Sequence, residues 1–273
     1  MSAAAKNTVL ITGSSSGIGA ATAAAFAATG WNVVATMRRP GPVSPDGMLV
    51  TRLDVEEPAS IDAAVRAGID AFGGIDVVVN NAGYGQYGLF ETVSPADARR
   101  QFEVNVFGPM AVMRAVLPHM RERGRGVIVN VSSGAGLYGL PGTSLYCASK
   151  FAIEGFSESV SYELGAAGIA VKLVIPHGGV SGTSFPGPDR PATAPPPGYE
   201  AFFAQSAASA TKAPAPVMVP AGQVALTVLA AATDGTDQLR YLVGNDTRGF
   251  IQAWETLPNA EFVAFMRAHF MSP

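Results

Sequence analysis

The chain has 273 residues, of which 48% are hydrophobic and only 14% are charged, and its formal net charge at pH 7 is −3. Low charge with many apolar residues excludes a disordered chain, and the lack of a Lys or Arg run argues against nucleic acid or an anionic membrane as a partner. The length suits a single α/β domain over residues 1–273, with two small domains as the less favoured alternative.

Cysteine, histidine and apolar patterns narrow the class further. The single cysteine, Cys147, excludes an intrachain disulfide framework, suits a reducing compartment and is expected to serve packing. The three histidines are far apart, so no metal site is expected. No apolar run reaches about 18 residues, and residues 1–6 lack the apolar core of a signal peptide. We therefore expect no membrane span and a cytoplasmic location.

Strands and helices alternate along the chain. The predicted strands cover residues 8–12, 32–36, 49–53, 76–80, 126–131, 170–175 and 240–243. The predicted helices cover residues 17–29, 58–72, 95–122, 144–165, 221–233 and 249–256. Continuous apolar runs such as Val77-Val78-Val79 indicate strands buried on both faces. The alternation predicts one doubly wound Rossmann domain, with a central parallel sheet of about seven strands flanked by helices.

A glycine-rich turn follows the first predicted strand. Residues 12–19 read TGSSSGIG, and an alanine-rich helix comes next. A strand, a glycine turn and a helix N-terminus together present backbone N–H groups to a pyrophosphate. The spacing is G-x-x-x-G-x-G, not the G-x-G-x-x-G fingerprint, so the prediction depends on the surrounding strand–helix pattern.

The end of the second predicted strand bears on the choice of dinucleotide. An acid near this point accepts hydrogen bonds from the ribose of NAD, but Met37 occupies the place here. Arg38 follows, and its guanidinium suits a 2′-phosphate. Arg39 either assists Arg38 in binding the phosphate or is a solvated surface charge. Ser16 in the glycine-rich turn adds no positive charge for the phosphate. The sequence therefore predicts NADP(H) as the preferred cofactor, with NAD(H) as the alternative.

Tyr146, Lys150 and Ser133 form a group suited to proton transfer at an oxygen. Tyr146 and Lys150 are four apart and share a helix face, and Ser133 ends the fifth predicted strand. A phenol ionises near pH ~10, and an adjacent ammonium favours the phenolate, so we expect Lys150 to lower the pKa of Tyr146. Ser133 would hold a carbonyl oxygen, and Ser132 is its rival.

The segment 182–220 is rich in proline and follows the sixth predicted strand. Its prolines flank a short apolar stretch around Phe202 and Phe203. A long loop on the ligand-binding side of an open α/β sheet is commonly a lid. We favour a substrate lid over a plain surface excursion.

These motifs resemble the short-chain dehydrogenase/reductase family in order and spacing, over about residues 6–180. The matching residues are the 12–19 turn, Asn80-Asn81-Ala82-Gly83, Asn105, Ser133 and Tyr146-Cys147-Ala148-Ser149-Lys150. The stretch 145–164 is similar to the branch with 17β-hydroxysteroid-like and retinol-like enzymes. The resemblance implies that Lys150 also binds the cofactor ribose, and that Asn105 binds a water through its backbone and connects Lys150 to solvent.

The resemblance also implies a set of cofactor contacts. Asn80 would lie beside the adenosine ribose and Asp54 near the adenine amino group. The expected cofactor-binding residues are Gly13, Ser15, Ser16, Gly17, Ile18, Gly19, Arg38, Arg39, Asp54, Val55, Asn80, Asn81, Ala82, Gly83, Tyr146, Lys150, Pro176, Gly178, Gly179, Val180 and Thr183.

The chain departs from the family pattern after the sixth predicted strand, where Pro176 is followed by His177 instead of glycine. His177 either enters the pocket or contacts the cofactor, or else turns away with Gly178 restoring the freedom of the loop. The departure also leaves open whether Ser181 or Thr183 binds the carboxamide or pyrophosphate.

The expected substrate pocket is mainly apolar and aromatic. Its residues are Tyr84, Tyr87, Ser133, Leu137, Tyr138, Leu140, His177, Phe185, Phe202 and Phe203. This lining favours a hydrophobic ketone, aldehyde or alcohol over a charged sugar. We expect an oxidoreductase with Tyr146 as general acid and base, and the alternative is a silent dinucleotide sensor on the same fold. Family habit implies a homodimer or homotetramer.

Overall fold

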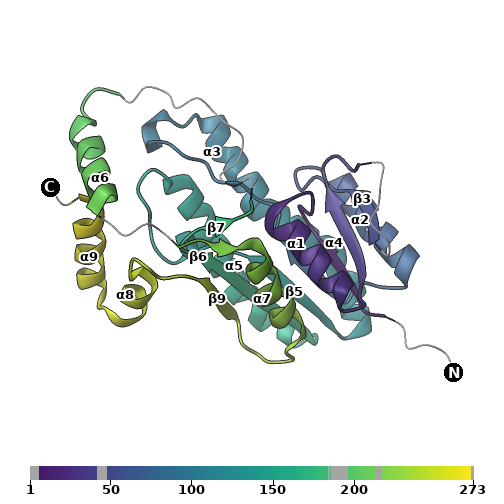
Figure 1. The fold of residues 1–273 in the computed structure, drawn as a ribbon. Coiled ribbons are helices and arrows are strands. Elements are labelled where there is room, and N and C mark those ends of the chain that lie inside the picture. The colour runs from purple at the N-terminus through teal and green to yellow at the C-terminus, as the bar shows by residue number, and fades with distance from the viewer. Residues whose placement is uncertain (1–5, 42–47, 184, 186–195, 213–216, 272–273) are drawn as a thin grey trace.

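A seven-stranded parallel sheet forms the centre of the computed structural model, which describes residues 6–41, 48–183, 185, 196–212 and 217–271 (Figure 1). The strand order is β3-β2-β1-β4-β5-β6-β9. The strands are β1 (Thr8–Ile11), β2 (Asn32–Met37), β3 (Met48–Arg52), β4 (Val77–Asn80), β5 (Gly126–Val131), β6 (Ile169–His177) and β9 (Arg240–Gly244). The predicted doubly wound Rossmann fold is confirmed. The order reverses between β1 and β4, which is where such sheets open a crevice for ligands.

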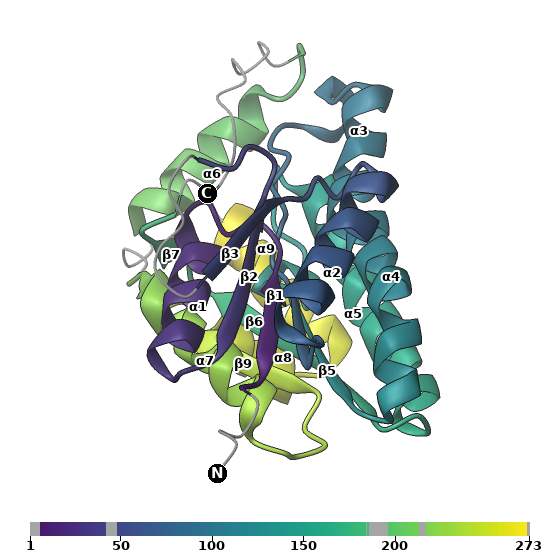
Figure 2. The ribbon, with the colours of Figure 1, turned by 90° about the vertical axis from the view of Figure 1, so that its right-hand side faces the viewer.

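Helices cover both faces of the sheet (Figure 2). Helices α1 (Gly17–Ala28) and α7 (Ala221–Thr233) pack on one face. Helices α2 (Pro58–Phe72), α4 (Gly108–Arg123) and α5 (Ser144–Gly165) pack on the other. Successive strand residues point to opposite faces, so Val9 and Ile11 join the first core and Leu10 joins the second. Burial on both sides explains the continuous apolar runs of the strands.

A third core lies at the C-terminal end of the chain. Helices α8 (Phe250–Thr256) and α9 (Asn259–Met271) pack with the outer part of β6, and α6 (Glu200–Lys212) lies against α9 (Figure 1). This core contains Leu173 and Ile175 of β6 together with Phe250 and Met266. The sequence analysis predicted neither α6 nor α9.

The single helix predicted over residues 95–122 is wrong in one respect, because it is divided into three parts. Helix α3 (Pro95–Phe102) runs into a π-helical turn, η2 (Glu103–Phe107), and α4 follows. Asparagine is a weak helix former, and Asn105 lies inside the π turn. Such turns are frequent at functional sites.

The 182–220 segment is not the continuous loop that the prolines suggested. A two-stranded parallel pair, β7 (Val180–Ser181) and β8 (Val219–Pro220), closes its ends, and α6 lies between them. The proline-free stretch 200–212 contains five alanines, which favour a helix. Residues 184, 186–195 and 213–216, with most of the prolines, lie outside the described residues. Two short 3₁₀ turns, η1 (Phe90–Thr92) and η3 (Gly134–Gly136), complete the described elements.

Candidate active site

The sequence motifs meet at one edge of the sheet, because the carboxyl ends of parallel strands align there. The glycine-rich turn follows β1, Asn81 follows β4, Ser133 follows β5 and His177 ends β6. Helix α5 brings Tyr146 and Lys150 to the same edge, since the β5–α5 connection is folded against it.

The turn between β1 and α1 is packed tightly around backbone. Gly13 and Gly17 have φ angles of 71° and 56°, which L side chains rarely adopt. The Ser14 amide donates to the Thr36 carbonyl at 2.9 Å, and this bond anchors the turn to β2. Helix α1 has no side-chain cap and no acidic residue in its first turn. Its free N–H groups, next to Ser15, Ser16 and Ile18, fit a pyrophosphate.

Gly19 marks the closest approach within this turn. A Cβ at this position would collide with the Gly13 carbonyl oxygen and lie 2.5 Å from Asn81 Nδ2. Asn81 cannot move freely, because its Nδ2 donates to the carbonyls of Thr12 and Gly13 at 3.0 and 3.1 Å. The turn therefore has no room for a side chain.

We expect Gly19→Ala to lower the free energy of unfolding by about 1–3 kcal/mol, because overpacking displaces backbone. Urea denaturation measures the change. Gly222→Ala in α7 is the matched control, since no heavy atom lies within 4 Å of a Cβ built there. The control should change stability by less than about 1 kcal/mol, and equal effects in the two variants would contradict the packing argument.

Asn80, at the end of β4, has a structural role, and residues 81–83 after it lie beside the glycine-rich turn and Asn105. The Asn80 amide donates to Asn130 Oδ1 at 2.8 Å inside the sheet, so its side chain is buried against β5 and does not face the cleft. The amides of Asn81 and Ala82 donate to the Thr12 hydroxyl at 3.0 Å each. A Cβ at Gly83 would lie 3.2 Å from Asn105 Oδ1. The expected contact between Asn80 and the ribose thus receives no support from its side-chain position.

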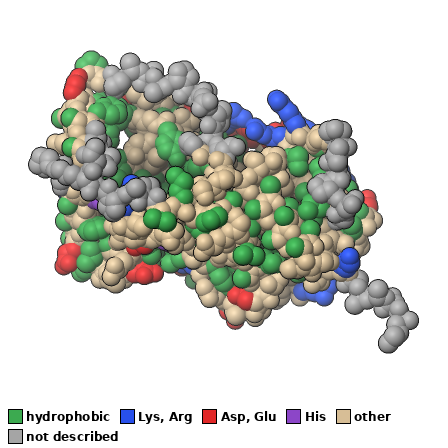
Figure 3. All heavy atoms as spheres, in the orientation of Figure 1, with side chains coloured by type: hydrophobic (Ala, Val, Ile, Leu, Met, Phe, Trp, Pro, Cys, Tyr) green, Lys and Arg blue, Asp and Glu red, His purple; other side chains and the backbone are tan. Residues whose placement is uncertain are grey.

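A cavity of about 590 Å³ lies at the ends of β2 and β3, where the adenosine half of a dinucleotide is expected. Its lining residues are Ser15, Met37, Arg38, Arg39, Arg52 and Asp54. Figure 3 shows basic side chains gathered over the region between α3 and β3. Arg52 was not among the residues expected to bind the cofactor, although its place at the end of the third predicted strand was a usable signal. The neighbouring Val55 packs against Gly108 below the cavity.

Ser133 and Tyr146 meet at the centre of the edge. Ser133 Oγ accepts the Ala135 amide at 3.2 Å, which holds the serine at the start of η3. Burial raises the pKa of Tyr146, and hydrogen bonding to Ser133 lowers it in part. The rival Ser132 lies on the other side, where its Oγ would be 2.9 Å from a Cβ at Gly136.

Lys150 is buried below the tyrosine. Its Nζ donates to the Val131 carbonyl at 2.9 Å and lies 5.8 Å from the centroid of the Tyr146 ring. Burial lowers the pKa of Lys150 to about 8, and Glu154 opposes the shift. The expected lowering of the Tyr146 pKa by Lys150 is not found: the pKa of Tyr146 is raised, because burial outweighs the other influences.

Lys150→Met should raise the free energy of unfolding by about 1 kcal/mol at pH 7, since it removes a buried ammonium. The folded-state pKa of Lys150 is about 8, below the ordinary 10.5. Its cost to stability is therefore complete below pH 8 and disappears as pH rises towards 10.5. Thermal unfolding of both proteins should show a smaller difference in stability between Lys150→Met and wild type at pH 9.5 than at pH 7.

Lys172→Met is the contrasting control for Lys150→Met. Lys172 is equally buried, but its ammonium lies 3.6 Å from Asp234 and donates to the Gln238 carbonyl at 3.0 Å. Removing a paired lysine leaves its partners unpaired, so this variant should lose stability. A loss of stability in both variants would contradict the account of Lys150.

Asn105 connects α5 to the loop after β4. Its Nδ2 donates to the Tyr84 carbonyl at 2.9 Å and to the Ser149 hydroxyl at 3.2 Å, and its Oδ1 accepts the Tyr84 amide at 3.1 Å. The side chain is thus fully engaged with protein, which leaves the backbone of the π turn for the water contact that the resemblance implies.

Phe185, Tyr87 and Gly85 lie over Tyr146. The Phe185 ring centroid is 5.4 Å from that of Tyr146, and a Cβ at Gly85 would lie 2.9 Å from both the Phe185 and Tyr87 rings. This group forms an apolar wall beside the phenol. Of the other predicted pocket residues, Leu140 packs near Tyr146 and Cys147.

The remaining predicted pocket residues lie further back. Leu137 and Tyr138 belong to the C-terminal core, and burial raises the pKa of Tyr138 to about 12. Phe202 and Phe203 lie on α6, where their ring centroids are 5.4 Å apart. The structure does not bring these two residues into contact with Tyr146 within the described ranges.

His177 is buried behind the serine turn. A Cβ at Gly134 would lie 3.0 Å from the His177 Cβ, and β6 pairs His177 with Gly244. Its Nδ1 is buried without a hydrogen-bond partner among the described residues. Burial lowers the pKa of His177, and Asp246 opposes the shift. Hence His177 packs inward at the end of β6.

The chain after His177 returns towards the dinucleotide turn. Gly178 and Gly179 have φ angles of 72° and 97°, which allow the bend after Pro176 and His177. Val180 then enters β7. Thr183 packs over Gly17, and its Cβ lies 3.2 Å from a Cβ built there. Thr183 is therefore close to the glycine-rich turn that is expected to bind the pyrophosphate.

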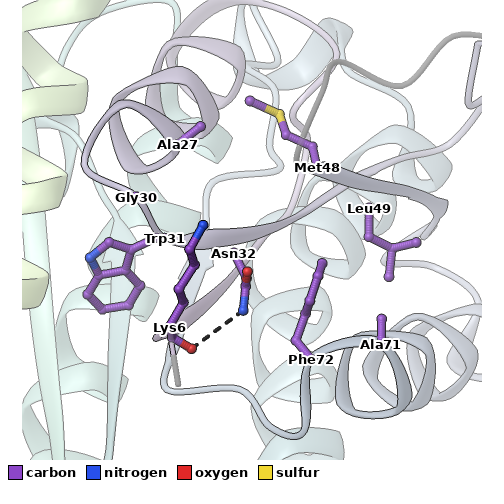
Figure 4. Close-up of a pocket in the computed structure, with 9 residues that line it drawn as sticks. All are labelled: Lys6, Ala27, Gly30, Trp31, Asn32, Met48, Leu49, Ala71 and Phe72. Carbon is purple, nitrogen blue, oxygen red and sulfur yellow. Dashed lines mark hydrogen bonds between the residues drawn. The ribbon is translucent and has the colours of Figure 1, made fainter. Parts of the chain in front are cut away.

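A second cavity lies at the opposite edge of the sheet, at the amino ends of β2 and β3 (Figure 4). Its lining residues are Lys6, Ala27, Gly30, Trp31, Asn32, Met48, Leu49, Ala71 and Phe72. It contains none of the predicted site residues. Within the described ranges, no His, Cys, Asp or Glu cluster could hold a metal ion. No described helix has the length and apolarity to cross a membrane.

Comparison with known sequences agrees with this arrangement. A family model described as short chain dehydrogenase matches residues 7–190. An oxidoreductase of Schizosaccharomyces pombe is 41% identical over 176 residues, which are 63% of this chain and 60% of that protein. A 3-ketodihydrosphingosine reductase of Bacteroides thetaiotaomicron is 41% identical over 169 residues, 62% of each chain. The chain therefore spans about three fifths of the length of these two relatives.

Solved structures extend the likeness over nearly the whole chain. A short-chain dehydrogenase from Streptomyces avermitilis is 32% identical with a TM-score of 0.80, and the match covers 96% of this chain and 97% of that one. The structure of ElxO with NADP bound is 24% identical with a TM-score of 0.71, covering 87% and 97%, and it shares the fold.

Proposed function

Because the chain belongs to the short-chain dehydrogenase/reductase family of oxidoreductases, we propose that it interconverts a hydrophobic ketone or aldehyde and the corresponding alcohol with NADP(H). The observation that carries the proposal is the meeting of Ser133 and buried Tyr146 above Lys150, at the edge that also holds the glycine-rich turn. The dinucleotide would supply or accept the hydride, and the protein would handle the proton and the oxygen.

Each polar group has a distinct role in this proposal. Tyr146 is the general acid in reduction, and its raised pKa keeps the phenol protonated at neutral pH. Ser133 holds the substrate oxygen beside it. Lys150 would bind the ribose of the dinucleotide from its buried position below the phenol. Asn105 connects Lys150 to solvent through the backbone of the π turn.

The preference for NADP(H) is supported by the cavity at the ends of β2 and β3. Met37 brings no negative charge to it, and Arg38 and Arg39 line it. A guanidinium suits a phosphate because it donates two parallel hydrogen bonds. The fold of this chain is shared by ElxO, whose structure has NADP bound. NAD(H) remains the alternative.

A hydrophobic substrate is supported by the apolar wall over Tyr146. Phe185 and Tyr87 would contact the substrate close to the reacting carbon. One relative is named for a ketone substrate, 3-ketodihydrosphingosine. The resemblance of the stretch 145–164 to the branch with 17β-hydroxysteroid-like and retinol-like enzymes would point to the same class of substrate.

In this proposal residues 1–273 form one domain, and the 182–220 segment is its substrate lid. Replacing 186–197 by a short Gly-Ser linker should change KM and the ranking of substrates, whereas the Kd for the dinucleotide should change less. Steady-state kinetics on several ketones and calorimetry with NADPH provide the two measurements. If ranking and constants are all unchanged, the segment is not a lid.

We also propose that the chain forms a homodimer or homotetramer through the outer faces of α4 and α5. Phe151 and Tyr162 of α5 are 47% and 74% exposed, and Phe107, at the end of η2 directly before α4, is 50% exposed. Exposed aromatic side chains on adjoining helices are a common feature of protein interfaces. Sedimentation analysis of the wild type and of a Phe151→Glu variant would test this surface.

The proposed activity is tested by turnover of a panel of aromatic and aliphatic ketones, aldehydes and alcohols with NADPH, NADH and their oxidised forms. The expected result is cofactor-dependent turnover of at least one hydrophobic substrate. Tight binding of the dinucleotide with no turnover of any substrate would instead favour a dinucleotide sensor on this fold.

A further inference from the structure

A third arginine lines the cofactor cavity from strand β3, whereas Arg38 and Arg39 come from the bend after β2. Arg52 is the last residue of β3, and the parallel register pairs it directly with Met37 of β2. Its side chain lines the same cavity as Arg38 and Ser15. Hence a ligand seated beside Met37 meets cations both from the bend after β2 and from the end of β3.

Arg52 is held at present by a neighbouring acid. Its Nη1 and Nη2 donate to the two oxygens of Glu57 at 2.9 and 2.7 Å. The two side chains are 48% and 52% exposed. Exposed ion pairs of this kind contribute little to stability, so the arginine can exchange its carboxylate for a better partner at small cost. A phosphate monoester carries more charge than a carboxylate and accepts the same bidentate pair.

We propose that Arg52 is a specificity-determining residue that binds the 2′-phosphate of the dinucleotide, and that Glu57 competes with that phosphate for it. The inference rests on the proposed binding of NADP(H). The register pairs Arg52 with Met37, the residue before Arg38, so both guanidinium groups can reach a phosphate bound in the cavity that they line. In this arrangement Glu57 weakens phosphate binding in two ways. It occupies the Arg52 guanidinium, and its carboxylate repels the negatively charged phosphate.

Asp54, the acid that lines the cavity, does not replace Glu57 as the partner of Arg52. Asp54 lines the cavity, but its Oδ1 accepts the amide of Glu56 at 3.1 Å in the turn after β3. Glu56 in turn pairs with Arg100 of α3 at 3.2 Å. The Arg100–Glu56 pair is exposed like Arg52–Glu57, but neither residue lines the cavity. It therefore supplies a matched control.

The test compares adenosine 2′,5′-bisphosphate with 5′-AMP, since the two probes differ only in the 2′-phosphate and neither reacts. Calorimetry gives both Kd values for the wild type and for Arg52→Gln, Glu57→Gln and Arg100→Gln. Arg52→Gln should weaken the bisphosphate at least about fivefold and 5′-AMP less than about twofold. Glu57→Gln should tighten the bisphosphate about two- to fivefold, and Arg100→Gln should change neither Kd by more than about twofold.

Arg52→Gln should raise the Kd for the bisphosphate and Glu57→Gln should lower it. A general loss of folding would not change the Kd in opposite directions. An unchanged preference for the bisphosphate in Arg52→Gln would overturn the inference. If the wild type binds neither probe, the proposed dinucleotide site fails as well, so the two failures are distinguishable. Equal changes in Arg52→Gln and Arg100→Gln would also overturn it, because they would indicate a general field effect.

Discussion

Replacing Tyr146 by phenylalanine is expected to lower kcat by ~10²–10⁴-fold while leaving the Kd for NADPH within about twofold of wild type. The phenyl ring still packs against Phe185 and within the small core around Ala135 and Cys147. Only the hydroxyl is lost, and with it the proton donor that lies beside Ser133. Single-turnover and steady-state rates with NADPH would measure the loss of the chemical step.

Tyr162→Phe is the matched control for Tyr146→Phe. Tyr162 lies on the same helix, but it is 74% exposed and belongs to the outer face. Its loss should change kcat less than about twofold, since it lies outside the site. Retention of more than about a tenth of kcat in Tyr146→Phe would contradict the role of the phenol as general acid.

The double variant Met37→Asp, Arg38→Ala is expected to reverse the cofactor preference. Wild type should favour NADPH over NADH at least about tenfold in kcat/KM, or ~1.4 kcal/mol of differential transition-state binding. The new aspartate would accept hydrogen bonds from the ribose hydroxyls of NADH and repel a 2′-phosphate. It would also face Arg52 across the β2–β3 register and compete for that guanidinium. Initial rates with both dinucleotides would measure the reversal.

The single variant Arg39→Ala tests the contributions of the two arginines that follow β2 separately. If Arg39 is a solvated charge, the ratio of kcat/KM for the two cofactors should change less than about twofold, as expected for an exposed charge. Equal use of NADPH and NADH by the wild type would show that Arg38 does not bind the 2′-phosphate.

The sequence determined the fold and the identity of the central residues. Strands of a doubly wound sheet are buried on both faces, so the runs Val9-Leu10-Ile11 and Val77-Val78-Val79 had to be apolar, and each predicted strand lies within two residues of its observed bounds. The meeting of Ser133 with the glycine turn followed from the same topology, since parallel strands end at one edge. The chemical roles and the cofactor preference stay predictions until the variants above are measured.

Tertiary structure alone decided the features that depend on contacts between distant segments. Asn105 lies in a π turn because its side chain binds the backbone of Tyr84, 21 positions earlier in the chain. Helix α6 packs against α9, whose place no local pattern indicated. Arg52 enters the cofactor cavity through the pairing of β3 with β2.

The pKa values of the site residues were also decided only by the tertiary structure. The spacing of Tyr146 and Lys150 puts them on one helix face, but it does not say how deeply they are buried or what else their polar atoms contact. In the folded chain Lys150 donates to Val131, and burial raises the pKa of Tyr146. A pKa depends on desolvation and on every nearby charge, and these are set only when the segments pack together.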